Sequence, residues 1–199
     1  MVVINGYAQS AKEHYKQGLE AQKKSNFKEA TKSFTSAINL KSDYTEAYFE
    51  RANCNFNLKQ FENALSDYIY LHRKSPLNEN YIIKAALSYI ELKRWAEAQT
   101  MFMKLESDEI NLHIAEAKVK MALCKIMLRN FEEAVQYLSE SLSIFADDDQ
   151  IYFYKGIASD SLNDYQTAVI CYTKSIEIIK QKLVKKSIST RNCDSLKCI

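Results

Sequence analysis

The chain repeats one short pattern five times, and this repetition limits its fold more than any other feature. The phrase aromatic-x-x-Ala recurs at steps of 34, 34, 36 and 34 residues, starting at Phe27, Phe61, Trp95, Phe131 and Tyr165. A column of small residues keeps the same steps, at Gly18, Ala52, Ala86, Ala122 and Gly156. A column of bulky residues keeps them too, at Phe34, Tyr68, Phe102, Leu138 and Tyr172. Three columns that share one irregular spacing predict an array of stacked structural repeats.

Each repeat is long enough for two amphipathic helices of about a dozen residues. The chain has 3 Gly and 1 Pro in 199 residues, which is too few for the many tight turns of a sheet protein. First helices are expected near 8–24, 45–58, 79–92, 113–128 and 149–162. Second helices are expected near 27–41, 61–74, 95–106, 131–145 and 165–185. The small residues let paired helices approach closely, and one repeat cannot bury its apolar face alone, so neighbours must stack.

These columns resemble the tetratricopeptide repeat, in which a small residue of the first helix precedes aromatic-x-x-Ala and a bulky residue in the second. The resemblance implies an all-α fold, a right-handed superhelical solenoid of about five helix-turn-helix repeats with a C-terminal helical extension. It places a lead-in at 1–10 and the array at 11–182, divided as repeats 1 to 5 at 11–44, 45–78, 79–112, 115–148 and 149–182. The basic tail at 183–199 is expected to continue the last helix, and its end is either disordered or ordered by a partner. The two extra residues of the 36-residue step lie between Glu106 and Ala115.

Composition argues against several classes of function. The 27 basic and 25 acidic residues give a net charge of +2, so the chain has no general electrostatic footprint for nucleic acid. No apolar run is long enough to span a membrane or to form a signal peptide, and we expect a cytoplasmic location, with ciliary or cytoskeletal association left open.

No pattern in the chain predicts catalysis, a cofactor or a metal ion. The five cysteines include no CxxC pair, the three histidines are isolated, and three scattered glycines cannot form a phosphate-binding loop. The acidic run at 147–149 directly precedes a predicted helix, where a carboxylate is expected to cap the helix start. We therefore expect a protein that is not an enzyme and that has no catalytic residue.

The family resemblance implies a concave groove lined by the first helices of the repeats. Most of the implied groove positions are apolar over repeats 2 to 5, and a stripe of that size is unusual on a bare monomer. The predicted groove residues are Phe49, Asn53, Phe56, Ile83, Leu87, Ile90, Val119, Leu123, Ile126, Phe153 and Ile157. Such a groove binds an amphipathic helix or an extended apolar peptide of a partner. Two alternatives stay open: it is filled by residues 186–199 or 1–8 of the chain, or it is closed by tight packing or self-association.

One subclass of the family binds acidic chaperone tails through a clamp of Lys, Asn and Arg. The corresponding positions are Tyr15, Leu19, Glu50, Asn80 and Lys84. Only Lys84 is compatible with an acidic tail, and Glu50 would repel it, so this partner is not expected. The sequence predicts a protein-interaction adaptor or scaffold; the alternatives are a permanent structural subunit of a larger assembly and, less favoured, an RNA-binding helical repeat.

Overall fold

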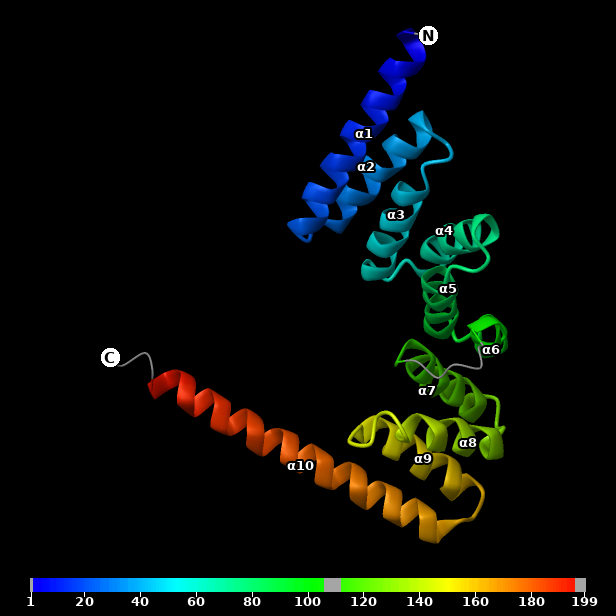
Figure 1. Ribbon diagram of the computed structural model, residues 1–199, viewed down its shortest axis with the longest axis vertical. Coiled ribbons are helices and arrows are strands. Elements are labelled where there is room, and N and C mark those ends of the chain that lie inside the picture. Colours follow the sequence, from blue (N-terminus) through cyan, green and yellow to red (C-terminus); the bar gives the residue numbers. More distant parts are fainter. Residues whose placement is uncertain (1, 106–111, 196–199) are drawn as a thin grey trace. The chain divides into compact units, whose positions relative to one another are not determined.

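The computed structural model describes residues 2–105 and 112–195, with side chains at 10–105 and 115–186. Over these residues the chain forms ten α-helices, one 3-10 turn and no strand (Figure 1). The helices are α1 (Val2–Lys23), α2 (Phe27–Leu40), α3 (Thr45–Asn57), α4 (Phe61–Lys74), α5 (Glu79–Glu91), α6 (Trp95–Phe102), α7 (Leu112–Met127), α8 (Phe131–Leu142), α9 (Asp149–Ser161) and α10 (Tyr165–Ser195). The predicted all-α fold of paired helices is confirmed.

The helices fall into two compact units, and the chain passes from one unit to the other between residues 105 and 106. The N-terminal unit holds α1 to α6 and the 3-10 turn Met103–Leu105, and the C-terminal unit holds α7 to α10. Within each unit every helix packs on the next one along the chain, as stacked helix pairs do. The extra two residues predicted between 106 and 115 overlap residues 106–111, which lie outside the described residues.

The small and bulky columns pack against each other, as the sequence predicts. A Cβ added to Gly18 would lie 2.5 Å from a ring carbon of Phe34, and one added to Gly156 would lie 2.6 Å from a ring carbon of Tyr172. In repeats 2 to 4 the small residue is a fully buried alanine. The bulky residue is buried in repeats 1 to 4 and half-buried in repeat 5. The core of each repeat is therefore the contact between these two columns.

A left-handed residue ends the first helix of every repeat. These residues have φ between 57° and 64°, and they are Ser25, Lys59, Lys93, Arg129 and Asn163. The following residue donates its amide to the carbonyl five residues earlier, at 2.8–2.9 Å in all five repeats. This arrangement closes the last helical turn, and it normally uses glycine, which this chain does not place there. Of the five residues only Asn163 is of a type that commonly adopts this conformation, so the sequence contains little turn signal at these positions, although the five loops share one geometry.

Polar side chains begin several of the helices. Asp148 caps α9 by accepting hydrogen bonds from the amides of Gln150 at 2.8 Å and Ile151 at 3.2 Å. This confirms that the acidic run at 147–149 has a structural role at a helix start. Near the end of the same repeat, Lys182 of α10 pairs with Asp149, the first residue of α9. The part of α10 that follows Lys182 therefore extends past the N-terminal end of α9.

Candidate partner-binding groove

The predicted groove residues lie on first helices: α3 and α5 in the N-terminal unit, and α7 and α9 in the C-terminal unit. None of them is fully buried, and Phe153 is 48% exposed. Six belong to one unit and five to the other, so each set is described by itself. The continuity of the stripe from one set to the other stays a prediction.

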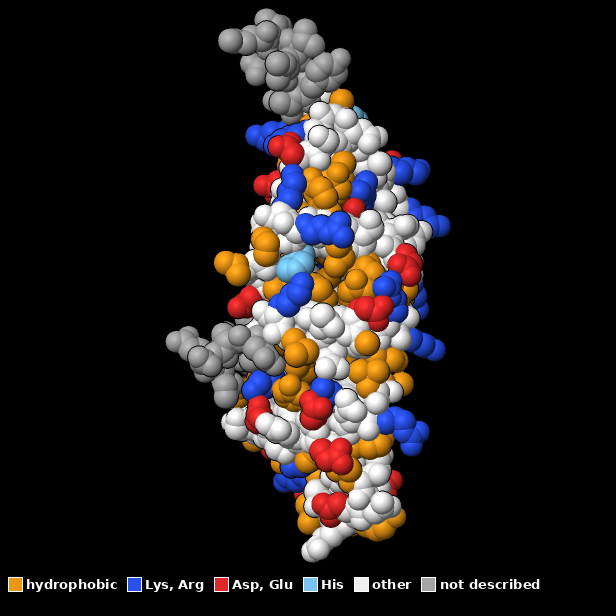
Figure 2. All heavy atoms as spheres, turned by 90° about the vertical axis from the view of Figure 1, so that its right-hand side faces the viewer, with side chains coloured by type: hydrophobic (Ala, Val, Ile, Leu, Met, Phe, Trp, Pro, Cys, Tyr) orange, Lys and Arg blue, Asp and Glu red, His pale blue; other side chains and the backbone are white. Residues whose placement is uncertain are grey.

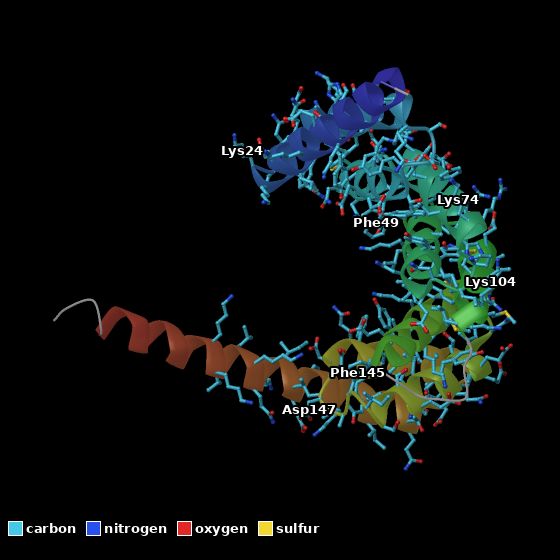
Figure 3. All side chains as sticks on the ribbon, turned by 45° about the horizontal axis from the view of Figure 1, so that its top comes forward. Lys24, Phe49, Lys74, Lys104, Phe145 and Asp147 are labelled. Carbon is cyan, nitrogen blue, oxygen red and sulfur yellow. The ribbon has the colours of Figure 1, made fainter. Side chains whose placement is uncertain are left out.

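Phe49 is the aromatic centre of the N-terminal set. Its ring lies 6.1 Å from that of Tyr68 on α4 and 5.6 Å from that of Tyr81 on α5, measured between centroids. Figure 3 shows Phe49 on one side of this unit and Lys74 and Lys104 on the other. Phe49 therefore joins repeats 2 and 3 while part of its ring stays accessible.

A polar network runs beside Phe49 and contains a carboxylate. Glu50 accepts hydrogen bonds from Gln22 of α1 at 2.8 Å and from Asn53 at 3.4 Å. Asn53 in turn accepts a hydrogen bond from the hydroxyl of Tyr68 at 2.8 Å. Burial raises the pKa of Tyr68, and the negative charge of Glu50 raises it further, so the hydroxyl stays a donor. Asn53 is thus tied to the framework of repeats 1 and 2.

The other N-terminal groove residues continue the apolar surface. Phe56 packs edge-on against Phe61 of α4, with centroids 5.2 Å apart. Ile83, Leu87 and Ile90 follow at spacings of four and three on α5, so they share one helix face. All three are partly exposed. This unit therefore presents half-buried aromatic and aliphatic side chains around one polar network.

In the C-terminal unit some of the predicted groove residues pack against the core, and others lie mainly at the surface. Val119 and Ile126 of α7 pack against a buried cluster that includes Ala122 and Leu138. Leu123 lies between them in sequence and is partly exposed. On α9, the ring of Phe153 lies 6.0 Å from that of Tyr172, and Ile157 follows one turn later. Val119 and Ile126 therefore have a structural role that the sequence pattern did not separate from the groove.

An ion pair that the sequence pattern did not indicate lies on a different face of the N-terminal unit. Arg51 donates two hydrogen bonds of 2.8 Å to Asp67, which is 5% exposed, and a third of 3.3 Å to Thr35. These groups line a polar cavity of about 330 Å³ together with Asn55, whose buried Oδ1 has no partner. The pair joins α2, α3 and α4, and a charge at each of two distant positions is the only sequence signal that could have indicated it.

Among the described residues, no group of three or more His, Cys, Asp or Glu could hold a metal ion. Burial raises the pKa of the Cys54 and Cys124 thiols to about 11, so both are protonated at neutral pH. Over the same residues, no helix has the length and apolar character needed to cross a membrane.

Comparison with known proteins agrees with the repeat pattern. Two family models described as tetratricopeptide repeat match residues 149–182 and 82–108. No curated protein matches the chain in sequence. Among solved structures, the MamA protein is similar with a TM-score of 0.78 and 12% identity, covering 88% of this chain and 94% of that one.

Two further solved structures have the same fold. The fragment "MamA 41-end from Desulfovibrio magneticus RS-1" has a TM-score of 0.77 and 12% identity, covering 86% of this chain and 96% of that one. YrrB, described as a TPR protein with an unusual peptide-binding site, has a TM-score of 0.74 and 14% identity, covering 89% of this chain and 90% of that one. The repeat columns, the helix pairs and these matches together identify the chain as a tetratricopeptide repeat protein.

Proposed function

We propose that this protein is a non-catalytic adaptor or scaffold that binds a helix or extended peptide of a partner protein through the predicted groove residues. The observation that carries the proposal is the half-buried state of these side chains on α3, α5, α7 and α9. Each is held by its own helix and still offers apolar surface, so a partner can cover it without refolding the protein. A cytoplasmic location is part of this proposal.

The structure supports an apolar rather than an acidic partner segment. Glu50 lies beside Phe49 and accepts hydrogen bonds from two groove-side amides, so a carboxylate already occupies the centre of the N-terminal set. A second carboxylate would meet like charge there. An apolar side chain seated against Phe49 and Phe56 instead adds about 1.5–3 kcal/mol when fully buried, before ordering costs.

Nucleic acid is a poorer match for the surface. On the face shown in Figure 2, basic and acidic side chains are interspersed, with small groups of hydrophobic side chains between them. The net charge of +2 points the same way. Binding driven by phosphate contacts needs a basic patch or stripe, which this face lacks.

The test combines photo-crosslinking with two groove substitutions. A photo-reactive phenylalanine analogue replaces Phe49 in one variant and Phe153 in another, and crosslinked proteins from native cells are identified by mass spectrometry. We expect both sites to capture the same partner. Adding Leu87→Glu and Leu123→Glu should abolish the capture, because each places a charge in an apolar contact.

The controls separate the groove from general effects of added charge. Leu77→Glu makes the same change at a side chain that is 94% exposed and outside the groove, and it should leave the capture intact. Circular dichroism must show unchanged helicity in every variant. Capture that survives the two groove substitutions contradicts the proposal. A chain that purifies only with fixed partners would instead indicate a permanent structural subunit.

A further inference from the structure

α10 carries an apolar stripe that the C-terminal unit leaves half-exposed. The α10 stripe follows spacings of 4, 3, 4, 3 and 4 residues and consists of Tyr165, Val169, Tyr172, Ile176, Ile179 and Leu183. Apart from Tyr172, these side chains are 42–63% exposed. The buried side of α10, at Ala168, Cys171, Ser175 and Ile178, is adjacent to the stripe and offset from it by one residue. Such alternation of threes and fours is the pattern of a seam between two long helices.

The same register positions are covered in the preceding repeat. Val135 and Leu142 of α8 correspond to Val169 and Ile176, one repeat earlier. Both are partly buried against a cluster that joins α7, α8 and α9 and that includes Ile151 and Ala158 of α9, the next helix in the stack. The stripe thus occupies register positions that are covered one repeat earlier, and α10 is the last helix among the described residues.

The stripe is longer than one more repeat would need. α8 ends at Leu142, which corresponds to Ile176, whereas the stripe continues to Ile179 and Leu183. A helix of 13 residues, the length of α9, could not follow it from Tyr165 to Leu183. The matching surface must come from a longer helix, and α10 itself has 31 residues.

We infer that the α10 stripe is a self-association face, at which two copies of this protein pair through antiparallel α10 helices. The stripe is complementary to itself when the second copy runs in the opposite direction. Tyr165 then faces Leu183 of the second copy, Val169 faces Ile179, and Tyr172 faces Ile176. Every member of the stripe has an apolar counterpart, and the arrangement has the two-fold symmetry common among protein dimers.

The charges on α10 favour the antiparallel direction. Residues 180–186 contain four lysines and no acidic residue, and residues 165–168 contain no charge. Antiparallel pairing places each lysine segment beside the uncharged start of the other helix and brings Lys185 near Asp164 of the second copy. Parallel pairing would place the two lysine segments side by side, where like charges repel.

Two further observations support a second copy in this antiparallel form. Every exposed side chain described on α1 is polar, so head-to-tail stacking of α1 on the stripe would bury charge. The half-exposed stripe offers on the order of 500 Å² per copy, so a pair buries on the order of 1,000 Å², close to the lower limit for a specific interface. We therefore expect association in the micromolar range.

Sedimentation velocity of the full chain, in reducing buffer from about 1 to 500 µM, tests the inference. The average mass should rise toward that of a dimer with concentration. Val169→Glu with Ile176→Glu should raise the dissociation constant at least tenfold. Ile170→Glu makes the same change at a side chain that is 60% exposed on a different face of α10, and it should leave the constant unchanged. Circular dichroism checks that each variant stays helical.

A chain that stays monomeric throughout, or a dimer that the double substitution does not weaken, overturns the inference. The direction is tested with spin labels at Thr173→Cys and, separately, Lys180→Cys, in a background in which Cys193 and Cys198 are serine. Antiparallel pairing predicts a label-to-label distance about 10 Å longer at 180 than at 173; equal distances overturn it. The inference is independent of the proposed groove function, because partner capture through Phe49 can be measured in the double variant.

Discussion

Single residues control how closely the two helices of a repeat approach. In repeats 1 and 5 the glycine at the contact lets an aromatic ring occupy the place of a Cβ. In repeats 2 to 4 the same position is alanine, fully buried. At the ends of the first helices, by contrast, the residue type does not match the backbone conformation. A left-handed conformation, which favours glycine, recurs there at five residues that are not glycine: Ser25, Lys59, Lys93, Arg129 and Asn163. At these positions the packing of the helix pair outweighs the backbone preference of the single residue.

At this scale we expect Gly18→Ala to destabilise the protein by about 1 kcal/mol. The new Cβ would lie 2.5 Å from the Phe34 ring, which is fully buried. The strain of an overfilled core, about 1–3 kcal/mol, outweighs the gain of about 1 kcal/mol in helix propensity. Repeats 2 and 3 hold alanine opposite an aromatic residue, so the helices can adjust and the loss stays small.

Urea unfolding followed by circular dichroism measures this change. Gly18→Ala combined with Phe34→Leu serves as the control, because Ala122 and Leu138 form the same pair in repeat 4. The double variant should lose less stability than the sum of the two single variants. A Gly18→Ala protein more stable than the parent would show that the close contact is not limiting.

At the scale of the element, helix ends and helix faces determine what each helix does. α9 begins directly after its capping residue, Asp148, and carries groove residues on one side and core residues on another. α10 is longer than any other helix in the described chain, and the members of its stripe other than Tyr172 stay 42–63% exposed. The two helices of a repeat thus provide core residues, groove residues and, on α10, an exposed stripe. The position of a residue around its helix decides to which of these three it belongs.

We expect Asp148→Ala to lower stability by about 1 kcal/mol, the usual cost of losing a helix cap. The Asp148 carboxylate accepts the amide hydrogens of Gln150 and Ile151, which no other group of the helix can accept. Thermal unfolding of the variant measures the loss. Asp147→Ala is the matched control, because Asp147 is exposed, adjacent and not the cap. Equal losses for the two variants would contradict the capping role.

At the scale of the whole molecule, packing is between neighbours along the chain. Within each unit, each helix contacts the next along the chain, and buried clusters lie around Phe34 in the N-terminal unit and around Leu138 in the C-terminal unit. In such arrays the effect of a core substitution is expected to fade with distance along the stack. The groove residues of each unit are therefore supported by that unit's own core.

We expect Leu138→Ala to destabilise the C-terminal unit by about 2–5 kcal/mol, because Leu138 is fully buried in its cluster. Amide hydrogen exchange should show lost protection in α7 to α10 and nearly unchanged protection in α2 to α4. Phe34→Ala in the N-terminal unit is the reciprocal control and should give the reverse pattern. Uniform loss of protection in both variants would indicate a single cooperative unit instead.

The candidate site was only partly accessible to sequence reasoning. The positions of Phe49, Leu87 and Phe153 on first helices follow from the register of the repeat, and the structure places them there. The core contacts of Val119 and Ile126, and the network that ties Asn53 to Tyr68 and Glu50, could not be predicted. Both depend on the rotation of one helix against another, which sequence spacing leaves undetermined.

The sequence by itself determined the number of repeats, the helix pairs and the small-against-bulky contact, because those depend on periodicity and on residue volume. The sequence also predicted that the last helix continues past its repeat, as α10 does. Only the tertiary structure decided which face of α10 is left half-exposed, and that the first helices close through left-handed residues at positions without glycine. The physical reason is that a repeated pattern specifies the contacts every repeat shares, whereas an end surface depends on which contact is missing there.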